Sequence, residues 1–536
     1  MKLQLARNAF ANLLGAAVPA AVALGTVPLI VRGLGDAGYG VYAMITAIVG
    51  YFAIIDINIT AGSVKHIAAH WAHGAQEDTA DEDSEREGSG QDGSEQGGSE
   101  QKHSVKGANE GIDQTITFGL LVYGALGIVG GIAVWVSAPW LVRDVFSVPA
   151  GMRMAATAAL ELAAAGFMVG QLQSYLDSVP QSLMRYDSSA RLDVLFGSAV
   201  PLATVAVLML GGGLYQVILL RVLASSLHCL LLWRAIRQLL PGWRLRWPAP
   251  SLRRSLLHFS AYAFLNRFAA MSYAYADKLM IGALVGVAGL AVYAVAATLA
   301  NRLLGLTGRL ASVLFPAASA LAASDELPRL VHIYLKASRY LTFINGAMLL
   351  LIAVFAEPIL RYWMSPDFAR RGATVLAVMA LSQCFDALTT LPSLVTDGMG
   401  HPAVTGGFAL ARALLGLATV YIGVLLGGID GAAWGHLAAS AIMTTVFLRY
   451  VHGRTVPVKL GVVLGSAYLP AAAGLVAIAA AASLVQQTAP AGIGVFLCTG
   501  LATLAALGLY GALVIAAPAD RARIKSIWPA RRAPGA

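Results

Sequence analysis

Four arginines in the second half of this chain lie inside long apolar stretches: Arg267, Arg302, Arg309 and Arg412. A charged side chain within hydrocarbon costs about 3 kcal/mol or more, so such residues normally face a water-filled cavity or an opposite charge. Guanidinium groups hold phosphate through paired, charge-assisted hydrogen bonds. We therefore predict that Arg267, Arg302 and Arg412 line a lumen and bind a phosphate-bearing group there.

A structural role for these arginines stays open as the alternative. Each could pair with Asp56, Asp277 or Asp386 and lock two helices together. Arg302 and Arg309 are seven residues apart and share one helix face. Arg309 is near the inner end of its apolar run, where reaching outward to water is as well supported as ligand binding. Asp56, near the inner end of the second apolar run, is the candidate coupling acid.

The elements that must position these side chains are membrane-spanning helices. The composition is 58% hydrophobic and 12% charged, with a mean hydropathy of +0.70, whereas soluble domains carry about 25% charged residues. Apolar runs of about 20 residues fill nearly the whole chain, and that is the length of a transmembrane helix. We predict an all-α polytopic membrane protein of about fourteen spans. The expected spans are residues 9–31, 41–63, 113–141, 152–176, 192–211, 214–236, 258–281, 290–321, 336–357, 371–395, 403–427, 431–450, 462–485 and 491–517.

A short motif occurs twice and divides the chain into two similar halves. Residues 35–43 read GDAGYGVYA, and residues 286–294, 251 positions later, read GVAGLAVYA. Each copy falls in a turn between two spans, where we expect glycine to supply the tight turn and tyrosine to lie at the membrane interface. A repeat of this kind is typical of duplicated transporters.

Charge is distributed as membrane topology requires. The net charge is +9, but residues 76–110 alone carry −8, so the rest of the chain carries +17. With the N-terminus inside, the predicted cytoplasmic segments hold 25 Lys and Arg and the opposite loops hold six. Positively charged loops stay on the cytoplasmic side. We therefore expect the protein to lie in the bacterial cytoplasmic (inner) membrane with both termini in the cytoplasm. Binding to nucleic acid is not expected.

These observations predict four parts. Residues 1–236 form an N-terminal lobe of six spans, interrupted by an acidic segment at 74–111 that should be disordered and cytoplasmic. Residues 237–257 form a basic linker, which either lies on the inner leaflet and contacts membrane lipids or serves only as a topological anchor. Residues 258–451 form a C-terminal lobe of six spans. Residues 452–536 add two further spans and a basic tail.

No catalytic or metal-binding pattern is present in the sequence. Cys229, Cys384 and Cys498 are far apart, each within an apolar run, so neither a disulfide framework nor a metal cluster is expected. We expect no cofactor, no metal and no enzymatic activity.

The chain resembles the polysaccharide-biosynthesis branch of the MOP superfamily, the Wzx-type flippases. The residues that carry the resemblance are Asn8, Arg32-Gly33-Leu34-Gly35, Tyr39-Gly40-Val41-Tyr42, Asp56, Asp277-Lys278-Leu279-Met280-Ile281-Gly282, Gly289 and Val292-Tyr293-Ala294. The chain departs from the family at Asp56-Ile57-Asn58, where a glycine is frequent, and in its acidic segment.

The resemblance implies two six-helix lobes related by a pseudo-two-fold axis along the membrane normal, followed by two extra helices. It implies a flippase that moves a polyprenyl-diphosphate-linked oligosaccharide from the inner to the outer leaflet by alternating access, for surface polysaccharide biosynthesis. It also implies Arg267, Arg302 and Arg412 as the cationic lumen, with a polysaccharide polymerase and glycosyltransferases as partners.

Three other functions remain open. A flippase for a lipid-linked peptidoglycan precursor would need the same lumen charge. A MATE-like drug antiporter would favour acidic and aromatic groups over arginine. A membrane polysaccharide polymerase or glycosyltransferase would need large outer loops or a nucleotide-sugar domain, and neither is visible in the sequence.

Overall fold

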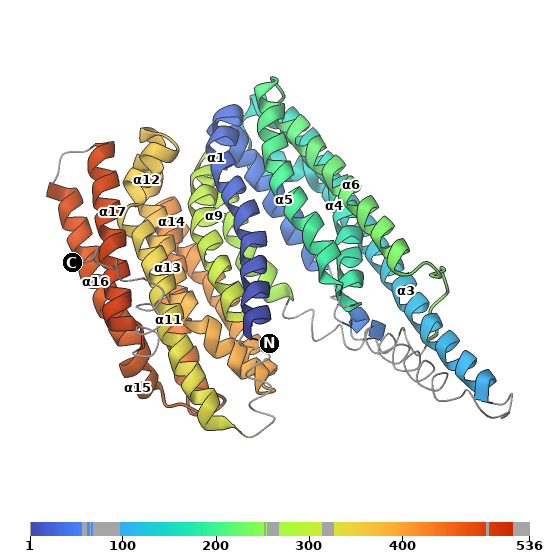
Figure 1. Cartoon of the computed structure of the whole chain (residues 1–536). Helices are drawn as coiled ribbons and strands as arrows, with labels where there is room; N and C mark the ends of the chain where they lie inside the picture. Colours follow the sequence, from blue (N-terminus) through green and yellow to red (C-terminus); the bar gives the residue numbers. More distant parts are fainter. Residues whose placement is uncertain are drawn as a thin grey trace, which may run out of the picture. The chain divides into compact units, whose positions relative to one another are not determined.

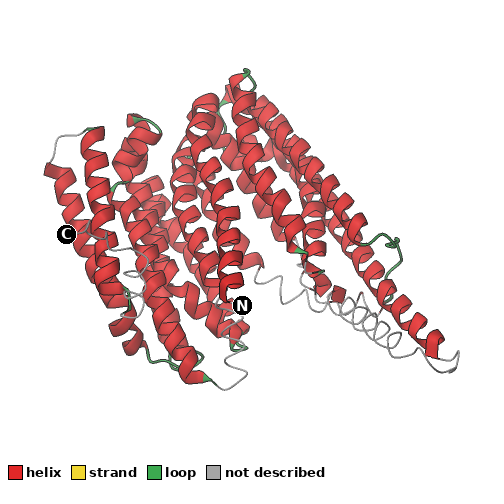
Figure 2. Ribbon diagram, in the orientation of Figure 1, coloured by secondary structure: helices red, strands yellow, loops and turns green. Residues whose placement is uncertain are grey.

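The described part of the chain is helical. The computed structural model describes residues 2–55, 97–183, 185–250, 267–312, 326–488 and 492–517, together with a few positions in 60–67 and Arg253. Within these ranges there is no β-strand, and the ribbon is helix throughout apart from short connections (Figure 2). The predicted all-α polytopic fold is confirmed.

The helices follow the predicted order of spans (Figure 1). The first half contains α1 (Lys2–Phe52), α3 (Gly97–Trp140), α4 (Ala150–Ser182), α5 (Tyr186–Met209) and α6 (Leu214–Leu239). The second half contains α8 (Asp277–Leu284), α9 (Val287–Ser312), α11 (Leu327–Val354), α12 (Ala356–Trp363), α13 (Pro366–Gly398), α14 (Pro402–Val451), α15 (Leu460–Val463), α16 (Leu469–Thr488) and α17 (Ile493–Tyr510). Short 3₁₀ or π-helical turns occupy Ala53–Ile55, Leu141–Val145, Ser272–Ala276, Leu464–Tyr468 and Gly511–Ile515.

Among the described residues, ten helices are long and apolar enough to cross a membrane. Two of them contain a break that separates two predicted spans: α1 at Gly35 and α14 at Gly427 and Gly428. Counting these breaks, and with α8 and α9 included, each of the fourteen predicted spans contains a described helix.

Both copies of the repeated motif have a glycine with a positive φ, a backbone conformation that other residues rarely adopt. Gly35 has φ 70° and Gly286, its counterpart, has φ 96°. A side chain would be strained in this left-handed region, so the tight turns predicted from the repeat are present. The two tyrosines of the motif differ in burial. Tyr42 is half-buried, whereas Tyr293 is fully buried with its hydroxyl 3.8 Å from Sδ of Met379, so that hydroxyl is not exposed to water. The depth of both residues in the membrane stays a prediction.

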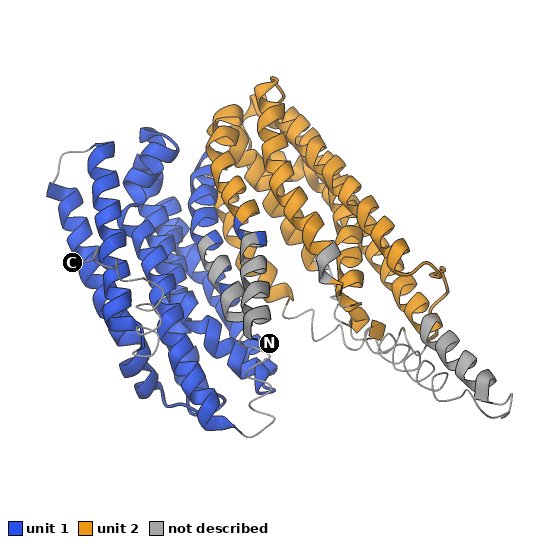
Figure 3. Cartoon of the chain, viewed as in Figure 1, with its two compact units in different colours: residues 1–17, 288–536 blue, residues 18–287 orange. Residues whose placement is uncertain are grey.

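The chain divides into two compact units, residues 18–287 and residues 1–17 with 288–536 (Figure 3). The predicted seventh span, 258–281, falls in the first of these, so the contact-defined units and the predicted lobes have different boundaries. The lobes and their pseudo-symmetry stay a prediction.

Helices α3, α4 and α6 make the core of the unit formed by residues 18–287. Tyr123 and Tyr175 are fully buried and stacked, with ring centroids 5.1 Å apart. The ring of Tyr175 lies against Gly119, where any side chain would overlap it, and its hydroxyl donates to the carbonyl oxygen of Thr115 at 3.0 Å. Aromatic packing through a glycine thus joins α3 to α4.

Part of the basic linker is attached to this unit. Trp243 is buried among core residues, and Arg246 forms ion pairs with Glu110 and, at 3.6 Å, with Asp113 of α3. Trp247 is 73% exposed and is left to contact lipid or solvent. The linker therefore has a docked part as well as an exposed apolar face.

The start of α3 lies within the predicted acidic segment, 74–111. Residues 74–96 of that segment lie outside the described residues, and α3 begins at Gly97. The predicted disorder of the segment stays a prediction. Extending an existing helix is easier than starting one, because each added residue brings its own backbone hydrogen bond. Glu, Gln and Lys are also good helix formers.

In the other unit, α13 packs against α11, α12 and α14. Of the two extra spans, α16 packs against α11 and α17 packs against α16. Ser365 caps α13 by accepting a hydrogen bond from the backbone N–H of Phe368 at 3.1 Å. The small residue Gly474 lets the ring of Tyr510 lie directly on α16. The predicted C-terminal pair of spans is thus present as α15–α16 and α17.

Candidate functional site

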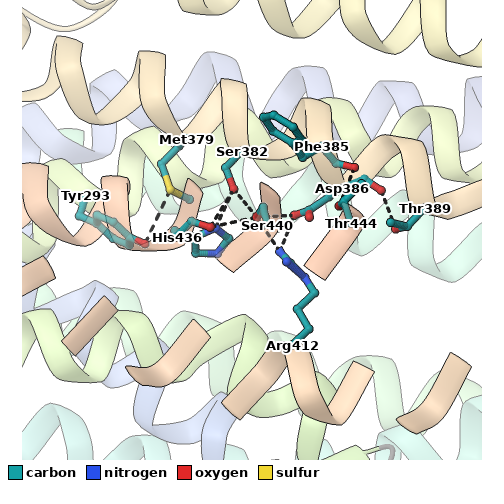
Figure 4. A network of polar contacts seen from close by, with 10 residues as sticks. All are labelled: Tyr293, Met379, Ser382, Phe385, Asp386, Thr389, Arg412, His436, Ser440 and Thr444. Carbon is teal, nitrogen blue, oxygen red and sulfur yellow. Dashed lines mark hydrogen bonds and ion pairs between the residues drawn. The ribbon is translucent and has the colours of Figure 1, made fainter. Parts of the chain in front are cut away.

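A buried polar network joins α13 to both halves of α14 (Figure 4). Its centre is an ion pair in which Nη2 of Arg412 lies 2.6 Å from Oδ2 of Asp386. The same nitrogen donates to the hydroxyl of Ser440 at 3.0 Å. The side chains of Arg412 and Asp386 are 19% and 10% exposed, so this pair is largely removed from solvent.

A second set of hydrogen bonds continues from Ser440. Its hydroxyl oxygen is 2.6 Å from that of Ser382, which in turn is 2.9 Å from Nδ1 of His436. Ser382 and Ser440 are completely buried and His436 is 7% exposed. Polar groups in a low-dielectric interior strengthen one another when each has a partner, and this network supplies those partners.

Helix periodicity explains how these side chains meet. Ser382 and Asp386 are four residues apart on α13, and His436 and Ser440 are four residues apart on the second half of α14. Residues at that spacing share a face, so two polar faces meet across the α13–α14 contact. Arg412 reaches the same place from the first half of α14.

The two halves of α14 approach closely because glycines line their contact. A Cβ at Gly423 would overlap the backbone of Gly431, and one at Gly431 would overlap the carbonyl oxygen of Gly423. A Cβ at Gly435 would likewise overlap the carbonyl oxygen of Thr419. Small residues allow backbones within a membrane to touch, and this contact fixes where Arg412 can reach.

A buried amide follows Ser382 on α13. Gln383 is completely buried, and neither its amide nitrogen nor its carbonyl oxygen has a hydrogen-bond partner among the described residues. An unsatisfied buried amide costs about 1–3 kcal/mol, so this position is suited to an ordered water or to a polar ligand group.

Chemically, the arrangement offers a guanidinium group whose carboxylate partner can be exchanged for another anion. In this conformation Asp386 and Ser440 occupy one nitrogen of Arg412. A phosphate oxygen has the same charge and hydrogen-bonding character as the carboxylate, so it could replace Asp386 on Arg412. Ser440 and Ser382 would supply further hydroxyl groups to a sugar or phosphate.

Of the other predicted site residues, the structure describes the side chains of two. Arg267 is half-buried and belongs to the other unit, and Arg302 is exposed on α9. Arg309 is in α9, but the structure does not describe its side chain, and Asp56 lies outside the described residues. Of the acids named as alternative partners, Asp386 pairs with Arg412, and Asp277 contacts Lys278 at 3.3 Å.

Sequence reasoning missed Ser382, His436 and Ser440. Each is an uncharged polar residue within an apolar span, and such residues are common in membrane helices. The available signal was the pairing of polar residues at a spacing of four, 382 with 386 and 436 with 440. The network thus contains one predicted site arginine, one predicted alternative partner and three unpredicted residues.

The fold defines the class of protein. The chain aligns with a lipid II flippase, MurJ, in an inward closed conformation with a TM-score of 0.70 and 12% identity, over 93% of this chain and 97% of that one. It aligns with an inward-facing MATE multidrug transporter of the MOP superfamily with a TM-score of 0.61 and 14% identity, over 81% and 97%. A MOP superfamily transporter from Pyrococcus furiosus aligns with a TM-score of 0.56 and 13% identity, over 86% and 96%. At these identities the likeness establishes the fold, and this is a multi-pass membrane protein with the fold of the MOP-superfamily transporters.

Sequence comparison narrows the class. Residues 111–370 match the family model described as polysaccharide biosynthesis protein. A putative O-antigen transporter of Shigella flexneri is 37% identical over 68 residues, 13% of this chain; the chain therefore spans only 16% of the length of that relative. The resemblance to the polysaccharide-biosynthesis branch of the MOP superfamily is confirmed.

Proposed function

We propose that this protein is a flippase that moves a polyprenyl-diphosphate-linked oligosaccharide from the inner to the outer leaflet of the cytoplasmic membrane. The observation that carries the proposal is the match of residues 111–370 to the polysaccharide-biosynthesis family on a chain with the MOP transporter fold. The partial likeness to a putative O-antigen transporter is in agreement. A transporter is favoured over an enzyme for the same reasons.

The physical task explains why such a protein needs a polar interior. Each unsatisfied polar group of a sugar headgroup costs several kcal/mol in hydrocarbon. A hydrated passage used by alternating access removes that cost, while the polyprenyl chain stays in the bilayer. Arginines would hold the diphosphate, and exchange with a nearby carboxylate would allow its release.

In this proposal Arg412 binds the diphosphate and Asp386 is its resting partner. The ion pair keeps the guanidinium group compensated while no substrate is present, since an uncompensated buried charge is strongly destabilising. Arg267 and Arg302, with Arg309, are proposed to act on the same headgroup, and Asp56 remains the candidate coupling acid.

The test measures transport of a fluorescent polyprenyl-diphosphate sugar in proteoliposomes. Arg412→Gln should reduce the rate about ten- to a hundredfold, because a lost hydrogen bond to a charged group is worth about 1.5–3 kcal/mol. Arg267→Ala and Arg302→Ala should abolish surface polymer in cells that still insert the protein. Lys at these positions should rescue only partly, because it lacks the planar fork of Arg. Arg449→Gln is the matched control, since Arg449 is exposed in the last turn of the same helix α14.

Asp386 separates substrate binding from a purely structural role. If Arg412 binds substrate, Asp386→Asn leaves much of the activity per folded, inserted protein intact, and Asp386→Asn with Arg412→Gln is as inactive as Arg412→Gln alone. Recovery of transport in that double variant, compared with Arg412→Gln, would show that Arg412 only locks α13 to α14. Normal polymer with both Arg267→Ala and Arg302→Ala would remove those residues from the site.

A lipid-linked peptidoglycan precursor is the second candidate substrate. The specific observation is the alignment with the lipid II flippase, which has the highest TM-score, 0.70, of the three structures compared above. Complementation separates the two functions. Restoration of surface polysaccharide in a flippase-deficient strain supports the first, and rescue of cell-wall synthesis alone supports the second.

A further inference from the structure

Outside the polar network, two aspartates and a histidine converge from three helices. Asp177 comes from the end of α4, Asp193 from α5 and His228 from α6. One potential ligand atom from each residue lies within 4.8 Å of the other two. All three belong to the unit formed by residues 18–287, and none takes part in the function proposed above.

The histidine is the fixed member of this cluster. His228 is only 4% exposed, and its ring stacks on Phe196 with centroids 4.6 Å apart and planes 2° from parallel. Its Nδ1 is 2.9 Å from the amide nitrogen of Gln173. Its Nε2 is buried and has no hydrogen-bond partner among the described residues. A buried ring nitrogen without a partner is costly, so this nitrogen is available to a ligand.

Gln173 and Ser225 form a hydrogen-bonded chain that holds the Nδ1 side of His228. The hydroxyl of Ser225 lies 2.6 Å from the amide oxygen of Gln173. Because a hydroxyl both donates and accepts, a half-turn of the amide preserves this bond and lets Gln173 accept from Nδ1–H. That tautomer presents the Nε2 lone pair, which is the arrangement that metal-binding histidines use.

The two carboxylates differ in exposure. Asp177 is half-buried, and its Oδ1 accepts a hydrogen bond at 3.0 Å from Ser189, which is 2% exposed. Asp193 is exposed. Two carboxylates so close to each other repel unless a cation lies between them. One half-buried carboxylate, one exposed carboxylate and one buried imidazole thus converge on the same place.

The geometry points to a site for a divalent transition-metal ion of the zinc class, held by Asp177, Asp193 and His228. Imidazole favours zinc and its neighbours, whereas Mg²⁺ and Ca²⁺ take oxygen ligands. Bonds of about 2.0–2.2 Å from Zn²⁺ to oxygen and nitrogen place tetrahedral ligand atoms roughly 3.3 Å apart. The ligand atoms, which lie within 4.8 Å of one another, would therefore move together by up to about 1.5 Å when the ion binds. A bound ion would join α4, α5 and α6.

The test uses the full-length protein in detergent, stripped with a chelator and titrated with Zn²⁺ by calorimetry, with metal content measured by mass spectrometry. We expect a single equivalent of zinc per chain. Asp177→Asn, Asp193→Asn and His228→Gln should each weaken it at least tenfold, and Gln173→Ala should weaken it about tenfold as a supporting residue. Asp144→Asn is the control, since Asp144 is an exposed aspartate paired with Arg143 and should leave zinc binding unchanged.

Two results would overturn the assignment. One is unchanged zinc affinity in both Asp193→Asn and His228→Gln, and the other is equal affinity of the unaltered protein for Mg²⁺ and Zn²⁺. Asp193 is exposed, so its substitution does not threaten folding. Co²⁺ added to the unaltered protein gives a visible spectrum of nitrogen and oxygen ligation if the site is as described, and the spectrum of free aqueous Co²⁺ if it is not. These measurements do not depend on transport.

Discussion

At the residue scale, the same arginine side chain can either hold two helices together or bind a substrate. Arg412 is paired with Asp386, one of the partners that the sequence analysis kept open as an alternative to substrate binding, and it also donates a hydrogen bond to Ser440. Removing one member of a buried pair costs about 3–5 kcal/mol because the other charge is left uncompensated. Transport measurements on Arg412→Gln therefore need the stability of the variant measured alongside.

A second buried residue gives a prediction about pH. His452 follows α14 and is 8% exposed; its Nε2 is 2.8 Å from the hydroxyl of Tyr334, and its Nδ1 is 2.8 Å from the carbonyl oxygen of Leu448. The carbonyl can only accept, so Nδ1 carries the proton and Nε2 accepts from Tyr334. Burial lowers the pKa of His452, partly offset by the hydrogen bond to Leu448.

A lowered pKa means that the folded protein binds a proton at His452 less readily than the unfolded chain does. This contribution to stability is therefore present above the ordinary histidine pKa of about 6.5 and is lost as the pH falls through the lower folded-state pKa. We expect the thermal unfolding temperature to fall on acidification across that range and to fall less in His452→Gln. An equal acid sensitivity in both proteins would contradict this role. His401→Gln, at an exposed histidine, is the control.

At the element scale, α14 depends on glycine in two different ways. Gly428 has φ 58° at the break between the two halves, whereas Gly423 and Gly431 provide the close contact between them. Because Arg412 is on one half and Ser440 on the other, this contact also positions the candidate site.

Gly431→Ala should therefore destabilise the protein by about 1–3 kcal/mol, the usual cost of overpacking, and should lower transport through the displaced Ser440. Gly416→Ala is the matched control on the same helix, because a Cβ there meets nothing within 4 Å. That variant should be neutral or stabilised by about 0.5–1 kcal/mol, since alanine favours helix over glycine. Thermal unfolding of the two variants in the same detergent is the measurement, and equal effects would refute the close-contact role.

At the scale of the whole molecule, the open question is orientation. The predicted topology places the loop around Ser147 outside and the linker around Gly242 inside, because the linker carries far more positive charge. Both residues are exposed.

Single cysteines can test this orientation after Cys229, Cys384 and Cys498 are changed to serine. A membrane-impermeant maleimide added to intact cells should label Ser147→Cys and leave Gly242→Cys unlabelled. Permeabilised cells should show labelling at both positions, which controls for accessibility. The opposite pattern would reverse the orientation and place the termini outside.

The sequence alone determined that this is an all-α protein of many membrane spans. Apolar runs of bilayer length dictate helices, because a backbone in hydrocarbon must satisfy its own hydrogen bonds, and all fourteen predicted spans contain a described helix. The repeated glycines at 35 and 286 also follow from local requirements, since a left-handed turn excludes most side chains. Such features depend on neighbouring residues and can be read along the chain.

Only the tertiary structure decided which polar side chains meet. Asp386 and Ser440 are 54 positions apart, and Asp177 and His228 are 51 positions apart. No spacing in the sequence links either pair. Their contacts depend on which faces of α13 and α14, or of α4 and α6, are turned toward each other, and that is set by the packing of many apolar side chains and glycines at once. The apolar runs of the sequence thus determine the helices. Helix packing decides the partner of Arg412 and brings together the cluster around His228.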